Sequence, residues 1–464
     1  MIARRAISPL ELVHATLERI DRTQSALNSF ITVCADSALA TARAAEAAIM
    51  HGESVGPLHG IPFSVKDLVN TKGVRTTYGS LIFQSHIPAV DAAVVTRLKA
   101  AGAILIGKTT TPEFGQKGLT EAPLFGRTCN AWRADRTCGG SSGGAAVAVA
   151  AGLGPLAVAT DGGGSTRIPA ACNGVVGFKQ SLGVVPHDTA QDAFGNISYI
   201  TPMTRTVMDT ALMLDAMAGP DPNDPLTLNR DRDSHSQAAQ PAGNLAGLKV
   251  GWRPYLGNTV VSAEVLAACA DAVKVFADLG AEVFEMPDDF ENAEELWLIV
   301  NGSYRLAQYG HHLEQHRDRM DPTLVAQLDR ASGYSAQDLY RAIFLRTKMY
   351  RQVQTWFEQA DIVITPTLAR TALPIEHQFF DVVEIDGKPV DTMRRAWYPY
   401  TLPFNMTGNP AMSIPCGWDS EGLPIGLQLI GWIGADAMLL RAAALFERAR
   451  PWAQRQPELA GPSA

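Results

Sequence analysis

Cysteine pairs, long apolar runs and runs of basic residues are all absent from this sequence. Its six cysteines are scattered without a C-x-x-C pair, which argues against a zinc ribbon or a dithiol redox site and indicates reduced thiols in a cytoplasmic protein. The longest uncharged apolar run, residues 145–160, is shorter than the stretch of about 20 residues that a membrane span needs. The net charge is -8 and no basic run is present, so we expect neither a nucleic acid nor a membrane as a partner.

What the chain does contain is an alternation of apolar strands and amphipathic helices. Hydrophobic residues make up 46% of the chain and charged residues 19%, which is typical of a globular enzyme with a large core. Ser8 and Glu11 form a capping box with a proline at the first helical position, so the first element is expected to be a helix. Strands that alternate with helices predict an α/β fold around one sheet. We expect strands near residues 30–33, 60–69, 103–106, 156–160, 248–252, 282–286, 361–366, 411–415 and 425–430, and helices near 8–23, 36–50, 91–101, 145–152, 206–217, 263–279, 335–359 and 436–449.

Residues 138–180 hold two serine clusters flanked by glycines. The first, residues 139–144, contains Ser141 and Ser142, and the second, residues 161–165, contains three consecutive glycines before its serine. Glycine loses more entropy on folding than other residues, so these clusters indicate backbone conformations that other residues do not reach. Because the second cluster follows an apolar strand, its N–H groups and its hydroxyl are expected to converge on one point. This is the arrangement of an oxyanion hole with a nucleophile beside it.

Three other patterns suggest different chemistry, and each has a simpler interpretation. Residues 102–109 match the P-loop pattern, but the apolar residues between the glycines predict a strand instead of a phosphate-binding loop. His312 and His316 have the spacing to share a metal on a helix, but no third ligand is apparent, so no metal is expected. Cys172 could serve as a nucleophile, but it has no obvious histidine partner and is expected to be a buried thiol.

Ser142 provides a further alternative, because residues 140–144 fit the G-x-S-x-G nucleophile elbow of α/β-hydrolase-type esterases. The elbow follows a buried strand, whereas residues 130–137 are polar and typical of a turn. This alternative would also need an acid and a histidine downstream, such as Asp188 and His235. It stays open as a second function with Ser142 as the nucleophile.

Lys66, Ser141 and Ser165, together with the segments around them, resemble the amidase signature family. The resemblance extends over nearly the whole chain and includes the glycine-flanked serines described above. The matching segments are GIPFSVKD at 60–67, GGSSGG at 139–144, TDGGGSTRIPA at 160–170, GVVGFK at 174–179, GNPAMSIPCG at 408–417 and LPIGLQLIG at 423–431.

The resemblance implies an α/β amidase signature fold, with a large central mixed β-sheet covered by helices on both faces. It further implies that residues 1–464 form a single domain. The catalytic core would comprise about 55–220 plus 400–450, and a more variable, mostly helical part would comprise about 220–400.

The resemblance also implies the roles of the site residues. Ser165 would be the nucleophile, and Ser141, which follows a cis peptide bond in this family, would bridge it to the base Lys66. The N–H groups of the glycine turn would form the oxyanion hole, and nearby polar residues would support it. The hole residues are Gly162, Gly163 and Gly164 with the Ser165 N–H, and the supporting residues are Ser142, Asp161 and Arg167. No metal or organic cofactor has a role in this chemistry.

Lys66 can accept a proton only as a neutral amine, which requires a pKa well below the ordinary value of about 10.4. Burial among the apolar residues of its strand is expected to lower that pKa, because desolvation disfavours the ammonium form. Protons would then pass from Ser165 through Ser141 to Lys66, and from there to the leaving amine.

These features predict an amidase that hydrolyses the C–N bond of linear carboxylic amides, extending to anilides, esters or carbamates, which pass through the same tetrahedral anion. The main alternative is the A-type glutaminase subunit of a tRNA-dependent amidotransferase. There, an acid holds the glutamine amino group, whereas Tyr398 stands at this position here. Tyr398 therefore predicts a bulkier, less polar substrate. The expected partner is a small-molecule amide, and the oligomeric state, including a homodimer, stays open.

Overall fold

An 11-stranded mixed sheet runs through the computed structural model, which describes residues 1–229 and 234–458. In spatial order the strands are β1 (Phe30–Val33), β3 (Ile104–Thr109), β2 (Pro62–Lys66), β6 (Leu156–Asp161), β8 (Tyr199–Thr204), β7 (Val176–Lys179), β14 (Ala411–Trp418), β15 (Pro424–Gly431), β11 (Ile362–Pro366), β9 (Lys249–Trp252) and β10 (Glu282–Glu285). β2 is parallel to both β3 and β6, and β9 is parallel to both β10 and β11. The other neighbouring pairs are antiparallel.

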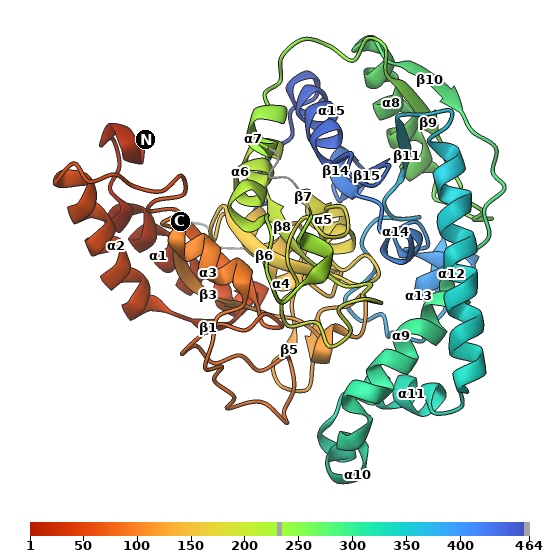
Figure 1. Ribbon diagram of the computed structural model, residues 1–464, viewed down its shortest axis with the longest axis horizontal. Helices are drawn as coiled ribbons and strands as arrows, with labels where there is room; N and C mark the ends of the chain where they lie inside the picture. Colours follow the sequence, from red (N-terminus) through yellow and green to blue (C-terminus); the bar gives the residue numbers. More distant parts are fainter. Residues whose placement is uncertain (230–233, 459–464) are drawn as a thin grey trace.

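Helices surround this sheet, and two short hairpins lie outside it (Figure 1). The hairpins are β4 (Glu121–Ala122) with β5 (Gly126–Arg127), and β12 (Glu384–Ile385) with β13 (Lys388–Pro389). The α-helices are α1 (Pro9–Leu27), α2 (Ala35–Met50), α3 (Ala93–Ala100), α4 (Gly143–Ala150), α5 (Arg167–Asn173), α6 (Val207–Met217), α7 (His235–Ala238), α8 (Ala263–Asp278), α9 (Glu294–Tyr309), α10 (Leu313–His316), α11 (Pro322–Ala331), α12 (Ala336–Trp356), α13 (Met393–Ala396), α14 (Leu402–Thr407) and α15 (Asp436–Ala449). The short 3-10 helices are η1 (Ile2–Arg4), η2 (Glu113–Gly115), η3 (Pro225–Thr227), η4 (Gly310–His312) and η5 (Arg317–Arg319).

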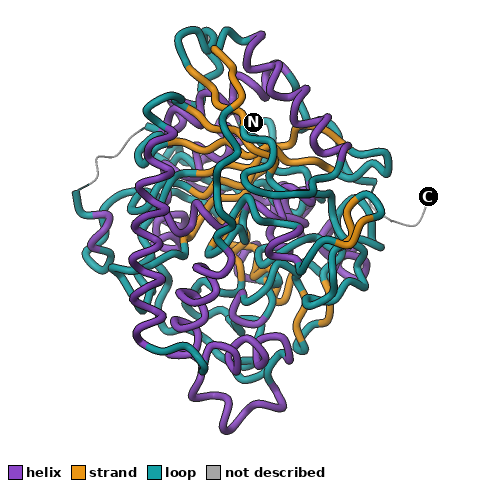
Figure 2. Tube along the Cα trace, turned by 90° about the vertical axis from the view of Figure 1, so that its right-hand side faces the viewer, coloured by secondary structure: helices purple, strands orange, loops and turns teal. Residues whose placement is uncertain are grey.

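Alternate residues of β6 enter two different apolar cores. Leu156 and Val158 belong to a large cluster that includes side chains of α6, α8 and α15, whereas Ala157 and Ala159 belong to a cluster with α1, α2 and α4. Successive side chains of a strand point to opposite faces, so helices pack on both faces of the sheet. Figure 2 shows the strands running through the middle of the molecule with helices on either side. The expected α/β fold with a large mixed sheet is confirmed.

Most of the expected helices and strands are present, but two strands in the middle of the sheet were not expected from the sequence. β8 pairs with β6 and contains Pro202, which lies opposite Val158. Proline cannot donate to a ladder and normally argues against a central strand. β7 is short and contains Gly177, which weakens its apolar pattern. These two residues explain why the sequence pattern does not predict either strand.

The sheet continues into the region that the sequence predicted as mostly helical. β9, β10 and β11 lie within residues 220–400, and they extend the same sheet beyond β15. The helices α9 to α12 from this region lie together at one side of the molecule in Figure 1. The single-domain organisation stays a prediction, which the continuity of the sheet supports.

Candidate active site

Lys66 is the last residue of β2, and its amine lies among three hydroxyl groups. Its Nζ is 2.7 Å from Ser141 Oγ, 2.9 Å from Ser142 Oγ and 2.8 Å from Thr160 Oγ1. The lysine side chain is fully buried, and no carboxylate in the described part of the chain forms an ion pair with it. The structure therefore brings Lys66 into direct contact with Ser141.

The surroundings of Lys66 favour its neutral form. Burial lowers the pKa of Lys66 well below its ordinary value of 10.5, because the amine loses its hydration. The Asp161 carboxylate opposes this shift, and the Arg305 guanidinium adds to it. The net result is a lowered pKa, which makes the neutral amine available at a lower pH than for an exposed lysine, as expected from the apolar strand around it.

Ser141 and Ser142 lie just before α4, and the peptide bond between Gly140 and Ser141 is cis, as the family resemblance implies. Ser142 is wholly buried, its N–H donates to Ser165 O at 3.1 Å, and its hydroxyl donates to Thr160 O at 3.1 Å. No strand precedes it in the way that a nucleophile elbow requires. The esterase alternative with Ser142 as the nucleophile is therefore not supported.

Ser165 follows the glycine turn after β6 and is partly exposed. It lines the same cavity as Ser141, Thr160 and Gly163. No described residue makes a hydrogen bond with the Ser165 hydroxyl, so Ser165 shares a cavity with Ser141 without a direct hydrogen bond between the two hydroxyls. A catalytic hydrogen bond often tightens only when the substrate is bound.

The glycine turn differs in one respect from the sequence prediction. The Gly164 N–H, which was expected in the oxyanion hole, donates to Asp161 Oδ1 at 2.6 Å and is therefore already engaged. Gly164 has φ +118, and a Cβ there would lie 2.2 Å from Thr401 Oγ1, so this position requires glycine. The N–H groups of Gly162, Gly163 and Ser165 make no hydrogen bond to any residue in the ranges 1–229 and 234–458.

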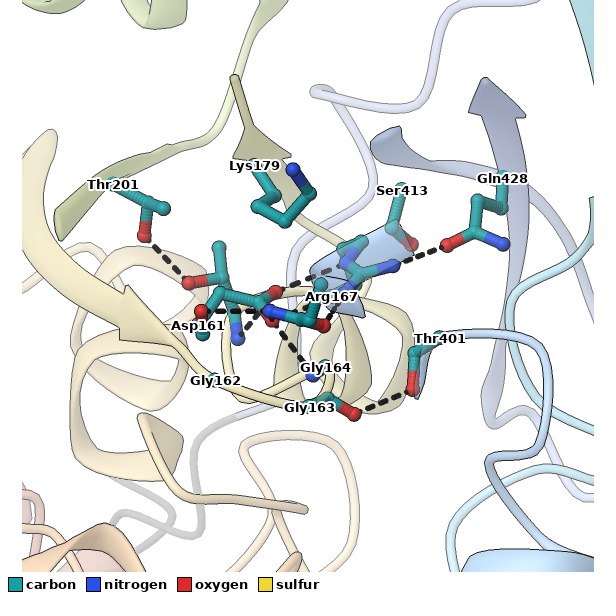
Figure 3. A network of polar contacts seen from close by, with 12 residues as sticks. Asp161, Gly162, Gly163, Gly164, Arg167, Lys179, Thr201, Thr401, Ser413 and Gln428 are labelled. Atoms are coloured by element: carbon teal, nitrogen blue, oxygen red, sulfur yellow. Dashed lines mark hydrogen bonds and ion pairs between the residues drawn. The ribbon is translucent and has the colours of Figure 1, made fainter. Parts of the chain in front are cut away.

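Asp161 and Arg167 form a buried ion pair beside this turn (Figure 3). The two side chains meet at 2.9 and 3.0 Å, and Arg167 also donates to Gln428 at 2.8 Å and to Asn405 at 2.6 Å. Burial raises the pKa of Asp161, but Arg167 and the hydrogen bond from Asn405 outweigh this effect and lower it overall. The pair is linked to the glycine turn through the Gly164 N–H, which donates to Asp161, and the supporting role expected for these two residues stays a prediction.

The turn faces a cavity of about 1240 Å³ that is lined by several aromatic rings. Tyr398 is buried and lines this cavity, and its ring packs so closely on Gly118 that a Cβ there would lie 2.8 Å from it. Burial raises the pKa of Tyr398 to about 12, so the phenol is protonated at neutral pH. The other aromatic lining residues are Tyr78, Phe83, Phe114, Phe194, Trp297, Tyr304, Tyr309 and Tyr350.

The remaining sequence patterns have structural explanations. The P-loop-like stretch forms β3, as its apolar residues predicted. Cys172 is buried and burial raises the pKa of its thiol, which confirms the interpretation as a buried thiol. The rings of His312 and His316 lie 6.0 Å apart, and the described residues contain no group of three or more potential metal ligands.

Two residues at the site were not expected from the sequence. Thr160 contacts the lysine amine, although the sequence patterns assigned it no role beyond its place at the start of the matching segment 160–170, where a strand leads into the glycine turn. Arg305 lies on α9 and lines the cavity, although no motif surrounds it. Its position depends on the tertiary packing of an amphipathic helix, which one sequence does not reveal.

Comparison with known proteins identifies the family of this site. A family model described as Amidase matches residues 11–440. The chain therefore belongs to the amidase family and is an amidohydrolase.

Its relatives include enzymes and one component of a larger assembly. The chain is 40% identical to an acylamidase of Rhodococcus erythropolis, over 98% of this chain and 95% of the relative. It is 35% identical to the A-type subunit of the glutamyl-tRNA(Gln) amidotransferase of Thermosynechococcus vestitus, over 99% of this chain and 98% of the relative. Its structure is similar to that of a bacterial aryl acylamidase of the amidase signature family, with a TM-score of 0.90 and 32% identity over 98% of this chain and 95% of the other. Among the described residues, no helix combines the length and apolar character needed to cross a membrane.

Replacing Arg167 with methionine should destabilise the protein strongly. Arg167→Met leaves the buried Asp161 carboxylate without its charged partner, which typically costs about 3–5 kcal/mol. The free energy of unfolding from urea denaturation measures this cost. Arg133→Met is the matched control, because Arg133 pairs with Asp135 at the exposed surface and its loss should leave stability unchanged. Equal unfolding free energies for the two variants would contradict the bracing role.

Proposed function

We propose that this enzyme hydrolyses carboxylic amides through a triad of Ser165, Ser141 and Lys66, with an acyl-enzyme intermediate. The observation that carries the proposal is the buried Lys66 amine in contact with the Ser141 hydroxyl, at the edge of the cavity that Ser165 lines. A serine hydroxyl is a weak nucleophile unless a base takes its proton during attack. An uncharged amine relayed through a second hydroxyl supplies such a base.

The hydrogen bonds around Lys66 support a direction for this relay. The Ser142 hydroxyl donates to Thr160 O, so it can only accept from the lysine amine. A neutral amine has two protons and one lone pair. If its protons go to Ser142 Oγ and Thr160 Oγ1, its lone pair is left for the O–H of Ser141. Ser141 Oγ is then free to accept the proton of Ser165.

The proposed reaction has two halves. Ser165 Oγ attacks the amide carbon while its proton moves through Ser141 to Lys66, and the carbonyl oxygen becomes an anion. The N–H groups of Gly162, Gly163 and Ser165 stabilise this anion, since Gly164 is engaged with Asp161. Collapse of the tetrahedral intermediate breaks the C–N bond, and the relayed proton leaves with the amine. Water then attacks the acyl-enzyme by the same relay and releases the acid.

We infer that the preferred substrates are amides with an aromatic or other apolar portion, such as anilides, and that esters and carbamates follow the same route. The aromatic lining of the cavity favours such groups. Tyr398 supplies a neutral phenol at the position where the family resemblance implies an acid for the glutamine amino group in a glutaminase subunit. The similarity to acylamidases supports this choice, and the similarity to the amidotransferase subunit keeps the glutaminase function as the second candidate.

We also propose that the enzyme acts in the cytoplasm on a small-molecule amide. All six cysteines are free thiols, and no disulfide joins Cys269 to Cys416, although their sulfurs lie only 3.9 Å apart. Free thiols in this number are typical of a reducing compartment.

The purified chain alone should hydrolyse an aryl amide such as 4-nitroacetanilide, without ATP and without a partner protein. Hydrolysis of glutamine should be at least about 100-fold slower in kcat/KM, because the cavity has no carboxylate at position 398 to hold the amino group. Release of 4-nitroaniline and of ammonia measures the two reactions. Efficient glutamine turnover that appears only with partner subunits, and no aryl amide turnover, would favour the glutaminase function instead.

The pH profile of kcat/KM should report the protonation of Lys66. Activity should rise with pH as Lys66 loses its proton, with a midpoint well below 10.5, because only the neutral amine accepts the proton of Ser141. Lys66→Ala should lose about 100-fold or more at neutral pH and less at high pH, where hydroxide can replace the base.

Lys108→Met is the matched control, since Lys108 is also a buried lysine, on the neighbouring strand β3, and burial lowers its pKa to about 8. It does not line the cavity, so its replacement should leave the midpoint of the acid limb unchanged. A Lys66→Ala enzyme with the wild-type acid limb would contradict the role of Lys66.

A further inference from the structure

α9 reaches the loop before the active-site serines through one guanidinium group. Arg305 Nη1 donates to Phe114 O and Nη2 donates to Gly115 O, both at 3.2 Å. No carboxylate within the described ranges forms an ion pair with Arg305, and its Nε has no hydrogen-bond partner. The two terminal nitrogens of its guanidinium group therefore donate to two successive backbone carbonyls.

These two carbonyls belong to an unusual turn. Phe114 has φ +48 and Gly115 has φ +67, so both residues are in the left-handed region. A residue other than glycine costs about 1–2 kcal/mol there, and the turn needs neighbours that hold it. α9 supplies a second contact, because the ring of Tyr309 stacks on Phe114 with centroids 3.9 Å apart.

The same turn lies directly against Ser141. A Cβ on Gly115 would lie 3.1 Å from Ser141 Oγ and 2.8 Å from Leu68 Cδ1. The backbone at Gly115 thus forms the wall beside the hydroxyl that contacts Lys66. A shift of this backbone would open space into which the Ser141 side chain could turn away from Lys66.

α11 holds the neighbouring residues of the loop. Gln116 donates to Thr323 at 2.6 Å, and Lys117 forms a buried ion pair with Asp321 at 2.9 Å. These contacts leave the carbonyls of Phe114 and Gly115 to Arg305. The helices from residues 294–331 therefore fix this loop at consecutive positions.

We propose that Arg305 is a positioning residue for catalysis: through the carbonyls of Phe114 and Gly115 it holds the loop against Ser141 and keeps the Ser141 hydroxyl on the Lys66 amine. This assignment rests on the proposed triad. Through Arg305, helix α9 would then contribute to the geometry of the catalytic residues.

The charge of Arg305 provides a second measurable effect beside kcat, namely the position of the acid limb of the pH profile. A residue that only stabilises the fold would not move this limb. Asp161 and Arg305 are the charged groups that act on Lys66, and Arg305 lowers the pKa of Lys66. Arg305 itself faces Arg394, Tyr304 and Tyr309. Removing its charge should therefore move the acid limb of the pH profile upwards, whereas keeping the charge should not.

Two substitutions at position 305 test the proposal with an aryl amide as the substrate. Arg305→Lys keeps the charge and loses the fork, so kcat should fall about 10- to 100-fold with little change in KM and with the wild-type acid limb. Arg305→Met should lose at least as much and should also shift the acid limb to higher pH. Arg319→Met is the control, because Arg319 donates to the carbonyl of Leu81, away from Ser141, and its kcat should match the wild type.

A second pair of variants tests the contact with Ser141 independently of Arg305. Gly115→Ala places a methyl group against Ser141 Oγ and should lower kcat about tenfold or more. Gly126→Ala is its control, because Gly126 has a similar φ of +79 and nothing within 4 Å of the added Cβ. Gly126→Ala should share the backbone strain and keep the wild-type kcat.

Ser165→Ala distinguishes failure of this inference from failure of the proposed function. If Ser165→Ala is inactive but Arg305→Met and Gly115→Ala have kcat within about twofold of the wild type, only the positioning role is overturned. If Ser165→Ala keeps its activity, the triad itself is wrong. A loss of kcat in Arg319→Met to the same degree would also contradict the positioning role.

Discussion

The site depends on the amine of Lys66, which is buried and contacts no negatively charged group among the described residues. Lys66 meets three hydroxyls and no carboxylate in the described part of the chain, and burial therefore lowers its pKa instead of being offset by an ion pair. A lysine paired with Asp or Glu would keep its proton and could not accept another. The three hydroxyls satisfy the hydrogen bonds of the amine, but they do not stabilise its positive charge as a carboxylate would.

A second pair of charges shows the opposite arrangement close by. Asp161 and Arg167 are also wholly buried, but they neutralise each other, and Asn405 and Gln428 take up their remaining hydrogen-bonding capacity. Arg167 lowers the pKa of Asp161, and the Asp161 carboxylate accepts the Gly164 N–H of the turn that carries Ser165. The chain thus places an amine without a countercharge and a buried ion pair close to the ends of the neighbouring strands β2 and β6.

Local patterns predicted the parts of the site that lie within one segment. The apolar strand before Lys66 and the glycine-flanked serines carry their signal in consecutive residues, and so does the capping box of α1, whose two hydrogen bonds are present. The role of Gly164 was not predictable, because its N–H is taken by the carboxylate of Asp161 only in the folded turn. Arg305 was missed for a related reason: the sequence of an amphipathic helix does not show which distant loop its polar side chains will contact. The central strand β8 was not predicted because it contains Pro202, and proline normally argues against a central strand. In the folded chain the pairing of β8 with its neighbours in the sheet outweighs this local preference.

The central claim is that Ser165 carries the acyl group, and peptide mapping of a trapped intermediate tests it most directly. The enzyme would be incubated with an aryl carbamate whose carbamoyl-enzyme hydrolyses slowly, then digested and analysed by mass spectrometry. We expect one added carbamoyl group on Ser165, and none when Lys66 is replaced by alanine at neutral pH. A carbamoyl group on Ser142, or on any residue outside the glycine turn, would contradict this claim.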